Sequence, residues 1–203
     1  MEQQKLLELI YTSRKTIIDM MIDRGLENKN GFLPFQHFLK TYQQMDVLDN
    51  NKNVLDLQFS NTQHHVYVKY IFSDKPNIKD TIENLQNLKL INENTKLIFV
   101  ICYDKDIPPK ILEQSSDKMQ FFHISKLLFN VTKHKLVPRH QLLTNDEKNV
   151  LKIKLHLESL GQLPCIQKKD PICQYYGAQP GDVFKIYRNS KTSLEHITYR
   201  VCV

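Results

Sequence analysis

The stretch that begins at Asp170 constrains the fold more tightly than any other part of the chain. Asp170 is a good helix cap, Pro171 suits the first helical position, and Gly177 can take the left-handed conformation that ends a helix. Pro180 and Gly181 follow in the order that a tight turn requires. These residues predict a short helix and a turn close together in the sequence.

Two predicted strands follow this turn. Val183–Arg188 alternates apolar and polar side chains, and residues 196–203 are rich in β-branched and aromatic types. Upstream, Thr144 or Asn145 is expected to cap a helix that has acidic residues in its first turn and continues to Gly161. The patterns predict a small α+β domain.

The rest of the chain alternates predicted helices with predicted strands. The helices are expected at residues 5–24, 34–45 and 75–90, and the last of them should turn Ile78, Ile82, Leu85 and Leu88 inward. The strands are expected at 54–59, 65–72, 96–102 and 120–124, with a hairpin between the first two and the third buried on both faces. We therefore predict an α/β domain over residues 1–130 and the α+β domain over residues 134–203, so that the chain is mixed α+β overall.

Charge is distributed unevenly. Of 28 Lys and Arg residues, 11 lie in residues 134–203, against only six of the 22 Asp and Glu residues. This second part therefore holds most of the net charge of +6, which suits an anionic partner such as nucleic acid or an acidic protein surface. No apolar run approaches the roughly 20 residues that span a bilayer, and the N-terminus does not resemble a secretory signal, so no membrane partner is expected.

The four cysteines have no metal-ligand spacing. Cys102 and Cys202 lie in predicted apolar strands and are expected to be buried thiols. Cys165 and Cys173 flank the cap at Asp170 and are the one pair that merits closer inspection. No metal and no cofactor is predicted.

A set of residues in the second domain carries a family resemblance. The set is His134-Lys135-Leu136-Val137-Pro138-Arg139-His140, Leu163-Pro164, Asp170-Pro171, Tyr176-Gly177, Pro180-Gly181, Val183, Lys185-Ile186, Arg188, Ser190 and Tyr199-Arg200. It resembles the assembly domain of the fifth subunit shared by eukaryotic nuclear RNA polymerases, a family that also has archaeal members. Cys165 departs from the family, which usually has arginine after Leu-Pro.

The resemblance implies a function for each domain. Residues 134–203 would dock on the largest polymerase subunit, and residues 1–130 resemble the jaw domain beside downstream DNA, which has restriction-endonuclease-like topology without nuclease activity. The expected docking residues are His134, Pro138, His140, Leu163, Pro164, Asp170, Pro171, Tyr175, Gly177, Pro180, Gly181, Arg188, Tyr199 and Arg200. The residues expected near DNA are Lys105, Pro108 and Lys110. Other polymerase subunits and transcription regulators are expected partners.

Two alternatives remain open at this stage. An active nuclease is disfavoured, because Tyr67-Val68-Lys69 has tyrosine where an acid-x-Lys motif needs its acid. A free-standing basic DNA-binding protein would instead bind duplex DNA in a salt-dependent way. The expected location is the nucleus for a cellular protein, or the virion or host cytoplasm for one encoded by a large DNA virus.

Overall fold

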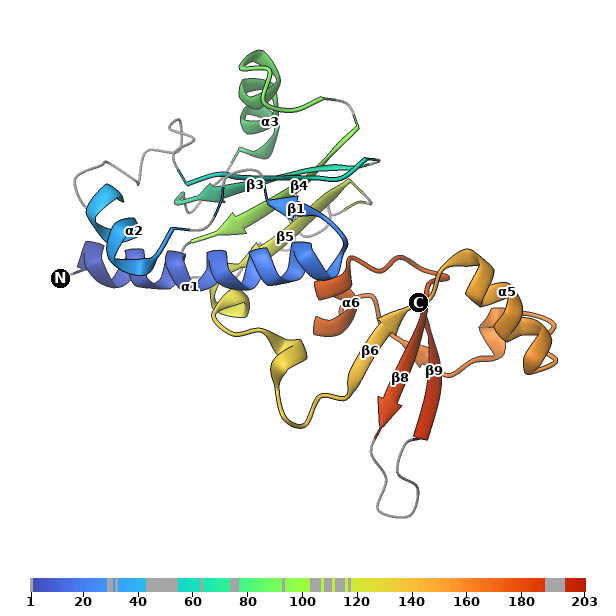
Figure 1. Ribbon diagram of the computed structural model, residues 1–203. Helices are drawn as coiled ribbons and strands as arrows, with labels where there is room; N and C mark the ends of the chain where they lie inside the picture. The colour runs from blue at the N-terminus through green and yellow to red at the C-terminus, as the bar shows by residue number, and fades with distance from the viewer. Residues whose placement is uncertain are drawn as a thin grey trace. The chain divides into compact units, whose positions relative to one another are not determined.

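The chain forms two compact units, residues 1–129 and 130–203 (Figure 1). The structure is a computed structural model that describes residues 2–28, 31, 33–42, 55–62, 64–73, 77–92, 94–102, 107, 111, 116, 118–188 and 196–203. Each unit contains one sheet and the helices that cover it, so the predicted mixed α/β fold class is confirmed.

The N-terminal unit is built on a five-stranded sheet. The strands are adjacent in chain order: β1 (Glu27–Asn28), β2 (Leu57–Ser60), β3 (His65–Ile71), β4 (Thr95–Ile101) and β5 (Met119–His123). β2 is antiparallel to β1 and β3, as the predicted hairpin requires, whereas β4 is parallel to both β3 and β5. Residues 97–101 of β4 are buried, which confirms a central strand covered on both faces.

Helices cover the two faces of this sheet. α1 (Glu2–Asp23) and α2 (Phe35–Tyr42) lie on one face, and α3 (Ile78–Asn87) lies on the other (Figure 1). The Ser13 hydroxyl on α1 hydrogen-bonds to the Tyr70 hydroxyl on β3 at 3.0 Å. A short 3₁₀ helix, η1 (Ile124–Leu127), follows β5 and contacts α1.

One predicted inward residue of the third helix is placed differently. Ile78 and Leu85 are buried and Ile82 packs against the same core, as expected. Leu88, however, is 57% exposed. It caps the end of α3, where the backbone leaves the helical path, and it therefore no longer shares the buried face.

The C-terminal unit is built on a four-stranded sheet. The strands β6 (Arg139–Leu142), β7 (Cys165–Ile166), β8 (Val183–Arg188) and β9 (His196–Cys202) lie in the order β6-β8-β9-β7. Only the short β7–β9 pairing is parallel among these described strands. The helical elements are η2 (Val131–Lys133), α5 (Asn145–Lys154), η3 (Leu160–Gln162) and α6 (Pro171–Tyr176).

Each face of this second sheet has its own core. On one face, Phe184 and Ile186 of β8 and Cys202 of β9 pack with Ile172 and Cys173 of α6. On the other face, Leu151 of α5 packs with a set of apolar residues that comprises Leu143, Leu163, Val183 and Val201. We call these the α6 face and the α5 face.

The predicted helix from Thr144 starts as expected but ends early. The Thr144 hydroxyl and the Glu147 side chain form a capping box, yet α5 ends at Lys154 and not at Gly161. His156 takes a φ of +51°, and the N–H of Leu157 donates to the carbonyl of Lys152. This is the Schellman arrangement that glycine usually provides, with histidine in the left-handed position.

The four cysteines differ in burial. All four are free, and Cys165 is exposed whereas Cys173 is buried. Cys173 on α6 packs with Cys202 on β9 in the core of the α6 face. Burial raises the pKa of Cys173 to about 12, which makes this thiol unreactive near neutral pH.

None of the helices in the described part of the chain has the length and apolar character that crossing a bilayer requires.

Candidate docking interface

The capped helix and the turn before β8 have the geometry that the sequence predicts. Asp170 Oδ1 accepts the Ile172 N–H at 2.8 Å, and Gly177 ends α6 with a φ of +67°. The N–H of Asp182 donates to the Gln179 carbonyl at 2.9 Å across the turn, where Gly181 has a φ of +90°. Local bonds thus set the direction in which β8 leaves α6.

The α6 face gathers several of the expected docking residues. His140 on β6 lies beside Ile186 on β8, which in turn pairs with Thr198 on β9. The His140 ring meets Phe184 edge-on at 6.0 Å, and the His140 carbonyl accepts the Tyr176 hydroxyl at 3.0 Å. This row of neighbouring residues, His140, Ile186 and Thr198, is therefore held in place by packing within the unit itself.

Charged side chains surround this row. Burial lowers the pKa of His140, and the positive charges of Arg188 and Arg200 lower it further, while Asp170 and a bond to the Pro138 carbonyl act in the opposite direction. His140 Nδ1 donates to that carbonyl at 2.7 Å, because a carbonyl oxygen can only accept. With the His140 ring neutral, Arg188 and Arg200 outnumber Asp170, so this cluster on the α6 face carries a net positive charge.

The α5 face carries a second group of cations, which sequence reasoning missed. Tyr187 on β8 has the Arg139 guanidinium 5.2 Å and the Lys185 ammonium 4.9 Å from its ring centroid. Its hydroxyl donates to Gln141 at 2.8 Å, and Tyr199 is the cross-strand partner of Lys185. The alternation within Val183–Arg188 indicated this face, but the neighbours from β6 depend on a long-range register.

Two predicted docking residues are core residues. Leu163 is 7% exposed and Tyr175 is 4% exposed. The Tyr175 hydroxyl accepts a hydrogen bond from Asn130 Nδ2 at 3.1 Å, so even its polar end is occupied within the unit. A direct contact of either side chain with a partner is therefore not supported, and both residues stabilise the unit itself.

The remaining expected docking residues lie in connecting segments. Pro164, Pro171, Pro180, Gly181 and His134 are exposed, whereas Pro138 and Gly177 are partly buried. The N–H of Leu136 donates to His134 Nδ1 at 3.2 Å, which shapes the segment before β6. Lys105, Pro108 and Lys110, the residues expected near DNA, lie outside the described residues.

The N-terminal unit contains a buried charged cluster that sequence reasoning also missed. Lys69 Nζ is 3.4 Å from Asp56 Oδ2, and the Tyr67 hydroxyl donates to the same oxygen at 2.5 Å. Burial raises the pKa of Asp56, although Lys69 and Tyr67 oppose the rise. Because the hairpin pairs Leu57 with Val68, the same register predicts that Asp56 meets Lys69. The acid beside this lysine therefore comes from the residue just before β2.

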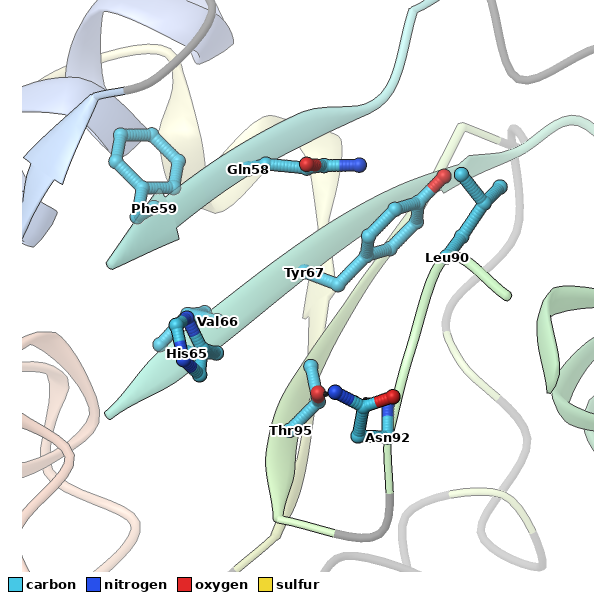
Figure 2. A pocket seen from close by; sticks show the side chains of 8 residues that line it. All are labelled: Gln58, Phe59, His65, Val66, Tyr67, Leu90, Asn92 and Thr95. Carbon is cyan, nitrogen blue, oxygen red and sulfur yellow. Dashed lines mark hydrogen bonds between the residues drawn. The ribbon is translucent and has the colours of Figure 1, made fainter. Parts of the chain in front are cut away.

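A small pocket lies beside the same strands. Its volume is about 170 Å³, and Figure 2 shows the side chains that line it, from Gln58 and Phe59 on β2 to Thr95 on β4. The Thr95 hydroxyl accepts the Asn92 N–H at 3.0 Å. No cluster of His, Cys, Asp and Glu side chains suited to a metal ion occurs among the described residues. The pocket offers no paired carboxylates for hydrolysis.

Comparisons with known proteins place the chain in a family. Residues 129–202 match the family model for the RNA polymerase Rpb5, C-terminal domain. Over 198 residues the chain is 32% identical to subunit 5B of DNA-directed RNA polymerases IV and V from Arabidopsis thaliana, which covers 95% of this chain and 88% of the relative. It is 31% identical over 203 residues to subunit rpabc1 of DNA-directed RNA polymerases I, II and III from Dictyostelium discoideum, covering 94% and 95%.

A nematode relative gives the same result. Subunit RPABC1 of DNA-directed RNA polymerases I, II and III from Caenorhabditis elegans is 28% identical over 205 residues, covering 96% of this chain and 95% of the relative. Similarity over nearly the full length of these subunits includes the N-terminal unit as well as the capped helix, the turn and the strand pair. The chain therefore belongs to the Rpb5 family of DNA-directed RNA polymerase subunits.

Proposed function

We propose that this chain is a non-catalytic subunit of a multisubunit DNA-directed RNA polymerase. The similarity to polymerase subunits over 94% or more of the chain is the observation that carries this proposal. In this proposal, nucleotide addition belongs to other subunits. The buried Asp56 supports it, because its carboxylate is occupied by Lys69 and Tyr67.

The C-terminal unit is proposed to dock on the largest polymerase subunit. Arg188 is exposed and Arg200 is half-buried, and both lie on the α6 face beside His140. Two cations on one face of a sheet favour an acidic partner surface, since the sheet fixes their backbone positions before binding. Pro164, Pro171 and Pro180 reduce the chain entropy that docking would otherwise cost.

The N-terminal unit is proposed to act as a jaw beside downstream DNA. A sheet with buried strands and helices on both faces provides a stiff body for such a role. Lys105 and Lys110 would meet DNA phosphates in this proposal, and Pro108 would shape the segment between them. Nuclear location is proposed on the same basis. The relatives named above are cellular proteins, so the comparisons give a virion no support.

Affinity purification from the source cells tests the docking proposal. The tagged chain should recover the large polymerase subunits, as identified by mass spectrometry. The double variant Arg188→Glu/Arg200→Glu should lose most of this recovery, because it inverts the charge of the α6 face. The matched variant Lys152→Glu/Lys154→Glu changes the net charge equally on exposed positions of α5 and should retain it.

Two results would contradict the proposal in different ways. Equal recovery by both folded double variants would exclude the α6 face as the docking surface. Recovery of nucleic acid without any polymerase subunit would favour the free-standing DNA-binding protein, whose affinity should fall steeply with salt.

A further inference from the structure

The outer edge of β9 is paired over only part of its length. On the inner side, the N–H of Cys202 donates to the Asp182 carbonyl at 2.7 Å, so in the antiparallel register residues 196, 198 and 200 also direct their backbone hydrogen bonds toward β8. Residues 197, 199, 201 and 203 instead point their backbone N–H and carbonyl groups toward the outer edge. The N–H of Val201 donates to the Pro164 carbonyl at 2.9 Å, and that of Val203 to the Ile166 carbonyl at 3.0 Å.

Pro164 explains why this pairing stops. Continuing the parallel register would require residue 164 to donate its N–H to the carbonyl of Tyr199, but proline has no N–H. Residue 162 belongs to η3 and has left the strand path. Among the described residues, the N–H and carbonyl groups of Ile197 and Tyr199 consequently have no backbone partner.

The opposite edge of the sheet is less accessible. On β6 the outward backbone groups belong to His140 and Leu142, because Leu143 next in line bonds to Val183 of β8. The Tyr176 hydroxyl already donates to the His140 carbonyl. Figure 1 shows β9 beside β8 on the side away from β6. The available edge is therefore that of β9.

The side chains next to this edge differ between the two faces. Ile197, which is 40% exposed, and Tyr199 lie on the α5 face, so an apolar residue of an added strand would pack there. Thr198 and Arg200 lie on the α6 face, with Arg188 on the neighbouring strand. The Thr198 hydroxyl oxygen is buried and has no hydrogen-bond partner among the described residues.

We propose that the partner of the C-terminal unit adds an extended strand along the outer edge of β9. The strand hydrogen-bonds to the N–H and carbonyl groups of Ile197 and Tyr199. Its side chains alternate, with an acidic residue toward Arg200 on the α6 face and an apolar residue toward Ile197 on the α5 face. The inference rests on the proposed function, because it takes the partner to be a polymerase subunit.

A proline substitution can test this edge without disturbing the pairing of β8 with β9. The N–H of Ile197 points outward, so Ile197→Pro removes an edge donor without removing any bond between β8 and β9. Ile197→Ala removes the same side chain but keeps the donor, and is the matched control. Circular dichroism and thermal melting of each purified chain establish that both variants remain folded.

The readout is recovery of polymerase subunits from the source cells, together with hydrogen exchange. We expect Ile197→Pro to weaken recovery by about tenfold or more relative to Ile197→Ala, because a donor is lost and the ring obstructs the added strand. In the native chain, the amides of Ile197 and Tyr199 should exchange rapidly when the chain is free and slowly in the recovered complex.

The outcomes distinguish strand addition from the proposed function. If the native chain recovers polymerase subunits and a folded Ile197→Pro recovers them equally, with no new amide protection at Ile197 and Tyr199, strand addition is wrong and the proposed function stands. If the native chain recovers no polymerase subunits, the proposed function fails and the inference that rests on it fails with it.

Discussion

The two sheets of this chain use their strands differently. In the N-terminal sheet, β4 has a parallel partner on each side and buried side chains from residue 97 to residue 101. In the C-terminal sheet, β9 has an outer edge that β7 covers only at Cys165 and Ile166, and its first five residues are exposed or half-buried. The first sheet supplies a stiff body, whereas the second leaves backbone groups where a partner can bind.

The ion pairs differ in the same way. Asp56 and Lys69 are almost fully buried in the N-terminal unit, with side chains 5% and 3% exposed. Lys148 and Asp182 in the C-terminal unit lie closer together, at 2.7 Å, but their side chains are 13% and 26% exposed. Distance alone does not rank such pairs, because an unpaired charge is much more costly inside the protein than near water.

Removing one member of the buried pair should give the largest effect. We expect Lys69→Met to lower the free energy of unfolding by about 3–5 kcal/mol, since it leaves Asp56 without a cation. Lys148→Met should cost only about 1 kcal/mol in the C-terminal unit. Urea unfolding of each variant, followed by circular dichroism, measures both values.

The pH dependence and a double variant sharpen this result. Burial raises the pKa of Asp56 above its ordinary value of 3.8. The folded state therefore loses stability relative to the unfolded state as pH rises from 3.8 through the folded-state pKa of this carboxyl group. The cost of Lys69→Met should therefore be greatest at neutral pH and shrink as pH falls toward 3.8. Asp56→Asn/Lys69→Met keeps an acceptor for Tyr67 and should restore most of the stability. A loss that is equal at all pH values would contradict this explanation.

Two residues of α5 test whether the C-terminal unit has a core of its own. Leu151 is 4% exposed and Ile153, two positions later, is 76% exposed. Leu151→Ala should cost about 2–4 kcal/mol, because it leaves a cavity against Leu163 and Val183. Ile153→Ala should stay within about 0.5 kcal/mol of the native chain. Thermal unfolding distinguishes them, and a larger loss for Ile153→Ala than for Leu151→Ala would mean that α5 packs with the other face inward.

The helix cap at Asp170 tests the local geometry beside His140 on the α6 face. Asp170→Ala should cost about 1 kcal/mol, because the Ile172 N–H loses its acceptor. Asp170→Asn keeps an acceptor oxygen and should cost much less, although it removes a negative charge near His140. Denaturant unfolding of the two variants measures the difference. Equal losses would show that charge, and not the cap, is the stabilising contribution.

Local signals in the sequence predicted the features that depend on a few neighbouring residues. The cap at Asp170, the left-handed Gly177 and the capping box at Thr144 each involve groups within one helical turn. The early end of α5 was not predictable in this way, because histidine at 156 carries a weaker signal than glycine. Glycine as the expected stop signal therefore extended the predicted helix to Gly161.

Features that depend on register were harder to predict. Tyr187 meets Arg139 only because β6, more than forty positions upstream, pairs with β8 in one particular alignment. The hairpin was predicted, but the Asp56–Lys69 pair also requires the observed register, in which Ser60 pairs with His65. The burial of Tyr175 was not predictable from the sequence, because a tyrosine on a six-residue helix suits either a core or an interface.

The smallest expected effect concerns the titration of His140. Burial lowers its pKa below 6.5, and nearby Arg188 and Arg200 act in the same direction. The unfolded state therefore binds the proton more readily, so the stability from the neutral ring is present above pH 6.5 and is lost as pH falls through the folded-state pKa. NMR titration of the ring should give a midpoint below 6.5, which Arg188→Gln should move upward and Asp170→Asn downward. A midpoint that Arg188→Gln leaves unchanged would mean that Arg188 lies too far from the ring to act on it, and the electropositive cluster on the α6 face would then have to be abandoned.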